Sequence, residues 1–299
     1  MSTKTTLEFP SLTQLMQAGA HFGHKKHRSV PSVRKYIFTV RDRVLVINLE
    51  KTLEQLEAAA AHVTELAKQG AMLLFVGTKR QATDLVKATA EALDQPYVNQ
   101  RWLGGTLTNF ETIQKRLKRL RELEGLVASE NFQQDHSKKQ RVMFDRELQR
   151  LNRTLGGIKQ LTRIPDALII IDTNEEANAL NEARRMKVPV VALVDTNADP
   201  DAVTKPIVAN DDSVNTITIV LNVLKEAALA GRKLVPVAAE AEESRIKNQE
   251  SSKNEDSSVE AKPEEKLAEK ATAKKPAAKK PAAKKSVAKK PAVKKTAKK

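Results

Sequence analysis

The sequence of 299 residues contains no cysteine, which excludes disulfide bonds and metal sites built on thiolates. No uninterrupted apolar run approaches the roughly 20 residues that a membrane-spanning helix needs. The N-terminus carries Glu8 and lacks the apolar core of a signal peptide. Hydrophobic residues make up only 40% of the chain, below the usual globular share. Together these features favour a cytoplasmic protein without a membrane partner.

The formal net charge of +15 is unevenly distributed along the chain. Residues 271–299 contain 12 Lys and no acidic residue, whereas residues 240–270 carry an excess of Asp and Glu. The residues before them are therefore only moderately basic. A basic excess in a soluble chain indicates a polyanionic partner, such as nucleic acid, or an anionic membrane surface.

The C-terminal segment is a repeat, in which Lys-Lys pairs begin at positions 274, 279, 284, 289 and 294. It has too little apolar area to offset its chain entropy, so we expect residues 271–299 to form a disordered tail after an acidic-mixed linker at 232–270. Such a tail would bind phosphates without sequence preference, or even compact DNA. A tail that only increases solubility is the alternative.

Residues 1–231 alternate apolar runs with amphipathic stretches and are predicted to form one folded body. Near-continuous apolar runs at 72–76, 167–171 and 190–194 are typical of parallel strands covered on both faces, and 207–208 is a shorter last strand. Helices are predicted at 11–18, 52–68, about 80–93, 175–186 and about 213–230, and a β-hairpin around residues 41–43. This alternation predicts an α/β fold with a doubly wound, mainly parallel sheet.

Residues 108–158 depart from this alternation of strands and helices, because their pattern is helical throughout and contains no strand. Ile113, Leu117 and Leu120 begin one apolar seam, and a second seam runs from Phe144 to Ile158. Two narrow seams joined by a polar loop predict an inserted antiparallel helical hairpin, a coiled-coil arm. Its outer face is basic and includes Lys115 and Arg119. This face would contact RNA or protein, or it would be a solvated coiled-coil surface.

Two glycine turns are candidate phosphate-binding segments. The first, GTKR at 77–80, lies between a strand and a helix, where α/β folds bind phosphates. It lacks the further glycines and the Gly-Lys-Ser/Thr ending of nucleotide loops, so a contact of Lys79 and Arg80 with an RNA phosphate is favoured. The second turn contains Arg101, Trp102 and Asn109. Trp102 would stack on a base or pack half-buried in the protein.

No catalytic or metal site can be assigned from the sequence. His24, Asp195 and Asp199 offer ligands for a structural Mg²⁺, but Asp at the end of a strand more often caps the next helix or turn. Asp172 and Asp195 would be the acids of a nucleotide- or flavin-binding enzyme on this fold. Because no supported catalytic set accompanies them, we predict no enzyme activity and no cofactor.

Several segments in order resemble the bacterial S-two family of small-subunit ribosomal proteins. They are AGAHFGH at 18–24, INLEKT at 47–52, LFVGTKR at 74–80, RWLGGTLTN at 101–109, PDALIIID at 165–172, VDTNADP at 194–200 and NDD at 210–212. Glu176, Glu182 and the Val188-Pro189 step fit the same pattern. The resemblance extends over about residues 7–230, and the order and spacing of the segments make it specific. The lysine repeat is a departure from the family.

The resemblance implies a flavodoxin-like body with an inserted helical hairpin. It further implies a structural constituent of the small ribosomal subunit that binds its rRNA and neighbouring ribosomal proteins. One such neighbour is the large OB-repeat ribosomal protein that gathers mRNA, for which the family is a docking base. We expect no homo-oligomer in the working form. The expected rRNA contacts are Lys25, Lys26, His27, Arg28, Lys79, Arg80, Arg101, Trp102, Asn109, Lys115 and Arg119.

Overall fold

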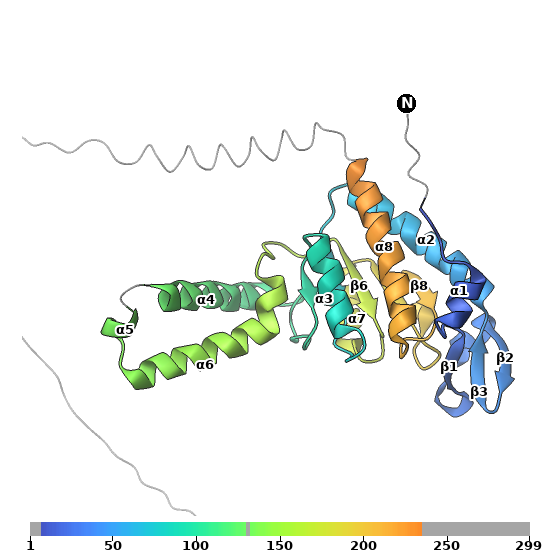
Figure 1. Ribbon diagram of the computed structural model, residues 1–299, viewed down its shortest axis with the longest axis horizontal. Helices are drawn as coiled ribbons and strands as arrows, with labels where there is room; N and C mark the ends of the chain where they lie inside the picture. The colour runs from blue at the N-terminus through green and yellow to red at the C-terminus, as the bar shows by residue number, and fades with distance from the viewer. Residues whose placement is uncertain (1–6, 130–131, 235–299) are drawn as a thin grey trace, which may run out of the picture. The chain divides into compact units, whose positions relative to one another are not determined.

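The structure is a computed structural model that describes residues 7–129 and 132–234 (Figure 1). The expected lysine-repeat tail at 271–299, and all but the first three residues of the expected linker at 232–270, lie outside the described residues.

The N-terminal part of the chain forms a short helix, a small sheet and a long helix. In order these elements are α1 (Leu12–Gln17), β1 (Phe22–Lys25), η1 (Lys26–Arg28), η2 (Pro31–Tyr36), β2 (Ile37–Arg41), β3 (Val44–Ile47) and α2 (Leu49–Lys68). The predicted N-cap of the first helix is confirmed, because Ser11 and Gln14 form a reciprocal capping box.

Strands and helices then alternate, with a helical insertion between the second and third strands of this part. The elements are β4 (Leu73–Val76), α3 (Thr83–Ala92), β5 (Tyr97–Val98), α4 (Phe110–Ala128), α5 (Phe132–Asp135), α6 (Lys138–Leu155), η3 (Gly156–Ile158), β6 (Ala167–Ile171), α7 (Ala177–Met186), β7 (Val190–Val194), η4 (Pro200–Ala202), β8 (Lys205–Val208) and α8 (Val214–Lys233).

The central sheet has five parallel strands in the order β5-β4-β6-β7-β8. If these five strands are numbered 1 to 5 in chain order, the order in the sheet is 2-1-3-4-5, which is the strand order of flavodoxin-like folds. The expected doubly wound fold is therefore confirmed. The topological switch point lies between β4 and β6, and the carboxyl ends of these strands carry the loops that begin at Gly77 and Asp172.

Helices cover both faces of this sheet, which explains why its strands are almost entirely apolar. Successive strand residues point to opposite faces, so Leu73 and Phe75 pack with α2, α3 and α8. Leu74 and Val76 pack with α7 and the base of the arm. Helix α8 is long and apolar enough to cross a membrane, but 56% of its most apolar window is buried in the protein. Most of its apolar side chains belong to the core, although Val214 and Leu229 are exposed.

The remaining strands form a separate antiparallel sheet in the order β1-β3-β2. The hairpin predicted around residues 41–43 is confirmed, and its two-residue turn places both Asp42 and Arg43 at positive φ, as type I′ turns require. Strand β1 was not predicted, since its sequence FGHK resembles a polar loop.

The predicted arm is also confirmed. Helices α4 and α6 run antiparallel and project from the sheet, with α5 at their far end (Figure 1). The seam of α4 is buried at Ile113, Leu117, Leu120 and Leu123. Leu123 covers the position at which the heptad spacing places Glu124.

Candidate nucleic-acid interface

Four of the expected RNA contacts lie together on one segment. Lys25, Lys26, His27 and Arg28 are consecutive and all exposed at the end of β1 and on η1. The backbone beside them is held in place, because the His24 N–H donates to Thr196 Oγ1 at 2.8 Å and the Val30 N–H to the Thr196 carbonyl at 3.0 Å. The four side chains therefore extend from a fixed backbone into solvent.

The close approach of this segment to the body depends on Gly23. A Cβ atom at this position would lie 2.6 Å from Cγ2 and 2.9 Å from Oγ1 of Thr196, and 3.2 Å from the carbonyl oxygen of Leu45. Glycine is needed here because two neighbouring chain segments touch its backbone.

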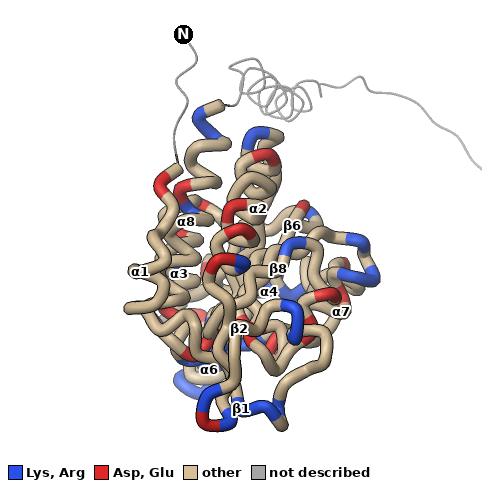
Figure 2. Tube along the Cα trace, turned by 90° about the vertical axis from the view of Figure 1, so that its right-hand side faces the viewer, with Lys and Arg blue, Asp and Glu red and all other residues tan. Residues whose placement is uncertain are grey.

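Two further cations belong to the same surface and were missed from the sequence. Arg41 and Arg43 are exposed on either side of the β2–β3 turn. The Lys26 N–H donates to the carbonyl of Arg43 at 2.9 Å, which joins the turn to η1. Figure 2 shows Lys and Arg gathered at this end of the small sheet. We call Lys25, Lys26, His27, Arg28, Arg41 and Arg43 the basic tip.

Lys79 was expected to contact an RNA phosphate, but it does not lie on an exposed basic surface. Its ammonium lies 3.2 Å from Asp172, 2.6 Å from Asp211 and 2.7 Å from Asp212. Burial lowers the pKa of Lys79, but hydrogen bonds to Asp211 and Asp212 outweigh it and the pKa is raised. Its charge is thus held by carboxylates of the protein. Its neighbour Arg80 is exposed, as a phosphate contact requires.

A backbone N–H group of the same loop is also bonded to a carboxylate of the protein. The Thr78 N–H donates to a carboxylate oxygen of Glu176 at 2.8 Å, and Glu176 is only 2% exposed. A carboxylate thus takes the position at the switch point where a nucleotide phosphate binds in related folds. This arrangement argues against the nucleotide- or flavin-binding enzyme.

Trp102 is a packing residue, and the expected stacking on a base is not supported. Its side chain is 6% exposed, and Nε1–H donates to Glu182 at 3.0 Å. The same carboxylate accepts hydrogen bonds from the N–H groups of Gly105, Leu107 and Thr108. Burial raises the pKa of Glu182, but these hydrogen bonds outweigh it and leave the pKa below its usual value.

The other expected contacts of this region are exposed. Arg101 and Asn109 flank the anchored turn, and Asn109 Oδ1 accepts from Thr112 Oγ1 at 2.9 Å. On the arm, Lys115 lies 2.7 Å from Glu111 on the same helix, and Arg119 lies 3.2 Å from Glu147 across the helix pair. Exposed pairs of this kind are weak, so a phosphate can replace the carboxylate.

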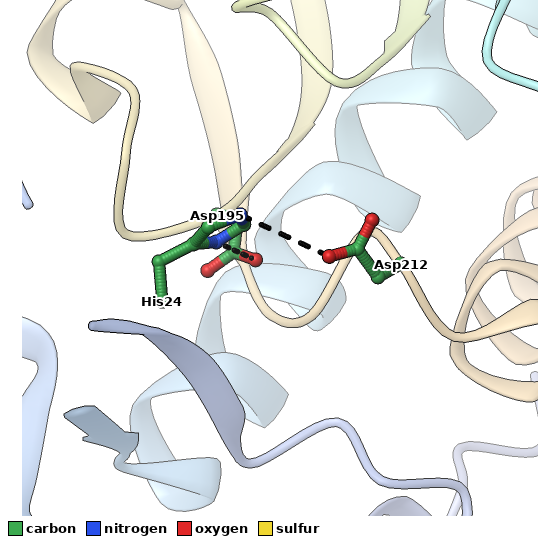
Figure 3. Close-up of side chains that lie close together, drawn as sticks. All are labelled: His24, Asp195 and Asp212. Carbon is green, nitrogen blue, oxygen red and sulfur yellow. Dashed lines mark hydrogen bonds and ion pairs between the residues drawn. The ribbon is translucent and has the colours of Figure 1, made fainter. Parts of the chain in front are cut away.

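His24 and Asp195 meet as expected, but Asp199 does not join them. Its carboxylate instead accepts from the Asp201 N–H at 3.1 Å and the Ser32 hydroxyl at 2.7 Å. Asp212 takes its place (Figure 3). One ligand atom each of His24, Asp195 and Asp212 lies within 4.8 Å of the others.

Within this cluster the imidazole contacts one acid at each nitrogen. His24 Nδ1 lies 2.8 Å from Asp195, and Nε2 lies 3.8 Å from Asp212. The hydrogen bond to Asp195 is the main reason that the pKa of His24 is raised, and burial opposes it. The cluster faces a hollow of about 440 Å³ that is also lined by Lys25, His27 and Arg28.

A third acid lies beside the cluster. Asp211 is fully buried, and its Oδ2 has no hydrogen-bond partner among the residues that the structure describes. Burial, together with the charges of Asp172 and Asp195, raises the pKa of Asp211. A cation between these acids would reduce their repulsion.

Comparisons with known proteins agree with the resemblance noted in the sequence. The family described as ribosomal protein S2 matches residues 15–231. Small ribosomal subunit protein uS2 of Corynebacterium kroppenstedtii is 44% identical over 232 residues, which cover 78% of this chain and 81% of the relative. The protein of the same name from Caulobacter vibrioides is 47% identical over 221 residues, which cover 74% and 82%. The chain therefore belongs to the ribosomal protein S2 family.

Proposed function

We propose that this chain is a structural, non-enzymatic constituent of the small ribosomal subunit in the cytoplasm, and that it binds rRNA through the basic tip. The observation that carries this proposal is the set of exposed cations on a fixed backbone, in a chain of this family. Cations held in position neutralise phosphates with little loss of side-chain and backbone freedom. Arg80, Arg101, Asn109, Lys115 and Arg119 are the secondary contacts.

Sedimentation of a cell lysate in a sucrose gradient tests this function directly. We expect the protein to migrate with the small subunit at moderate Mg²⁺ concentration, and the triple variant Lys25→Ala, Lys26→Ala, Arg28→Ala to shift toward the free fractions. A matched variant that removes three exposed cations elsewhere, Lys68→Ala, Arg184→Ala, Arg185→Ala, should stay on the subunit. Wild-type protein that runs free of the subunit would contradict the proposal.

We infer, second, that the chain docks the OB-repeat ribosomal protein that gathers mRNA. This function is implied by the resemblance, and it is supported by an apolar groove of about 490 Å³ between α1 and the small sheet. Leu12, Met16 and Phe38 line the groove and are 41%, 55% and 74% exposed. Exposed apolar side chains that lie together mark a protein-binding surface.

A binding assay with the purified OB-repeat protein tests this docking. We expect Met16→Ala combined with Phe38→Ala to weaken binding at least tenfold, since two large anchors are lost. Met143→Ala is the control, because Met143 is 60% exposed on α6 and far from the groove in sequence. Equal binding by the double variant and the control would place the docking surface elsewhere.

We propose, third, a divalent cation at His24, Asp195 and Asp212, favoured by their geometry and by the unpartnered oxygen of Asp211. The sequence favoured Mg²⁺, whereas an imidazole beside carboxylates suits Zn²⁺ better. Calorimetric titration of the whole protein with each ion is the test. Asp212→Asn should abolish the tight site, and Asp201→Asn, an exposed acid of the neighbouring turn, should retain it. Equal titration curves for the two variants would refute the site.

A further inference from the structure

A polar hollow of about 650 Å³ lies at the base of the arm, on elements that take no part in the basic tip or the cation cluster. It is formed by the last turns of α6, by η3, by the middle of α3, and by β5 with the segment that follows it. Its volume is within the range of pockets that hold a small organic ligand. We call it the arm-base pocket.

The floor of the pocket depends on a close approach between two distant segments. A Cβ atom on Gly157 would lie 2.2 Å from the carbonyl oxygen of Tyr97 and 2.7 Å from the Tyr97 ring. Only glycine permits η3 to lie this close to β5. Tyr97 therefore contributes a half-buried aromatic ring to the pocket, with one part of the ring covered by the η3 backbone.

The charge of the pocket suits an anion. None of its ten lining residues is acidic, and three are basic, namely Lys87, Arg153 and Lys159. Lys87 lies 3.9 Å from Glu91, and Lys159 is paired with Glu124. Arg153 Nε–H instead donates to the amide oxygen of Gln100 at 3.4 Å. Arg153 thus offers a guanidinium that a phosphate can engage.

Four amide side chains supply the remaining polar groups, namely Asn99, Gln100, Gln149 and Asn152. Each amide offers two N–H donors and one oxygen acceptor. Asn99 uses one N–H for the carbonyl of Thr83, and Gln149 uses one for Asp145. Both donors and acceptors therefore remain for a ligand with a mixed hydrogen-bonding edge, which a nucleobase has.

We propose that the arm-base pocket binds one unpaired nucleotide of an RNA, with its phosphate at Arg153, its base edge at the amides and its ring against Tyr97. Unpaired bases that extend from a helix are the usual targets of sequence-specific RNA binding, and they stack on aromatic rings. A concave pocket cannot admit a paired base. This assignment rests on the proposed rRNA-binding function. It adds a pocket that would recognise one base to the basic tip, which would bind phosphates.

Fluorescence anisotropy with the full-length protein tests the proposal. The probes are a short RNA duplex with one unpaired adenosine and the same duplex without it, and AMP is the competitor. We expect roughly tenfold tighter binding of the RNA with the unpaired base, as loss of one stacked base would predict. Because the two duplexes differ by only one phosphate, the non-specific contribution of the lysine repeat is nearly the same for both and largely cancels in the ratio of their affinities.

Two variants of α6 connect this preference to the pocket. Arg153→Ala and Asn152→Ala should remove most of the preference, whereas Arg150→Ala, which removes the same charge outside the pocket, should leave the ratio unchanged. A wild-type ratio near one, or an equal effect of Arg150→Ala and Arg153→Ala, would overturn the proposal. Displacement of the RNA by AMP at similar concentration would overturn it in favour of a free nucleotide.

Sedimentation of the same proteins separates the two proposals. Wild-type protein that migrates with the small subunit but does not prefer the unpaired base overturns the pocket and leaves the ribosomal function intact. Protein that neither migrates with the subunit nor binds the plain duplex overturns both.

Discussion

The indole N–H of Trp102 donates to the carboxylate of Glu182 at 3.0 Å, although the two residues are 80 positions apart in sequence. This contact joins the glycine turn that precedes the arm to helix α7 of the central body. The same carboxylate accepts from three backbone N–H groups of the turn. Glu182 thereby fixes the position from which the arm departs.

We predict that Glu182→Ala destabilises the protein by about 2–3 kcal/mol, because several donors lose a charged acceptor. For a body of this size that corresponds to a fall of about 5–10 °C in Tm. Trp102 is the only tryptophan, so its fluorescence should shift to longer wavelength as the turn loosens.

Glu182→Gln keeps one acceptor oxygen and should lose less stability. Glu175→Ala changes an exposed acid of the loop before α7 and should alter Tm by no more than about 1–2 °C. A Glu182→Ala protein with wild-type Tm and fluorescence would mean that the turn is held by its apolar contacts alone.

The central sheet was predictable because burial on both faces forces continuous apolar strands, and the runs at 167–171 and 190–194 coincide with β6 and β7. Strand β5 was missed because its two residues, Tyr97 and Val98, carry no periodic pattern. Strand β1 was missed because none of its four residues, FGHK, is buried and they show no apolar-polar alternation. Local pattern identifies strands that build the core, and it fails for short strands fixed by tertiary contacts.

The site was only partly predictable for a related reason. The exposed cations near His24 were recognised because a basic run has no other partner in the local sequence. The partners of Lys79 come from loops more than 90 positions away, and no local spacing reveals them. Asp212 likewise replaced Asp199 because the ends of β7 and β8 are neighbours in the sheet, although Asp199 is nearer to Asp195 in sequence.

Lys79 should therefore affect stability, apart from any role in RNA binding. Lys79→Met leaves the buried acids Asp172 and Asp211 without their cation, and we predict a loss of about 3 kcal/mol in the free energy of unfolding. The measurement is urea denaturation, with Lys68→Met, an exposed lysine of α2, as control.

A compensating change distinguishes this cause from lost packing. Asp211→Asn in the Lys79→Met background removes one of the two unpaired charges and should restore part of the lost stability. If the double variant is no more stable than Lys79→Met, repulsion between the acids does not explain the loss.

His24 should make stability depend on pH. Asp195 and the other nearby acids raise the pKa of His24 above its usual 6.5, so the folded state holds its proton more tightly than the unfolded state. This stabilisation is complete below the unfolded pKa and is lost as the pH rises through the folded pKa. It should therefore be larger at about pH 5.5 than at about pH 8.

His24→Asn keeps a hydrogen-bond donor near Nδ1 and does not titrate, so it isolates this contribution. With a chelator present, the difference in free energy of unfolding between wild type and His24→Asn should shrink as the pH rises. A difference that is constant or grows with pH would show that His24 gains no proton affinity on folding.

If the basic tip contacts RNA, its cations should contribute to the salt dependence of RNA binding. Each cation that neutralises a phosphate contributes about one to the slope of the logarithm of affinity against the logarithm of salt concentration. With purified small-subunit rRNA, the triple variant Lys25→Ala, Lys26→Ala, Arg28→Ala should therefore have a slope smaller by about two to three. The variant Lys68→Ala, Arg184→Ala, Arg185→Ala changes the net charge equally and should keep the wild-type slope. Equal slopes for both triple variants would mean that total charge, mostly from the lysine repeat, governs binding, and the tip would not be a contact surface.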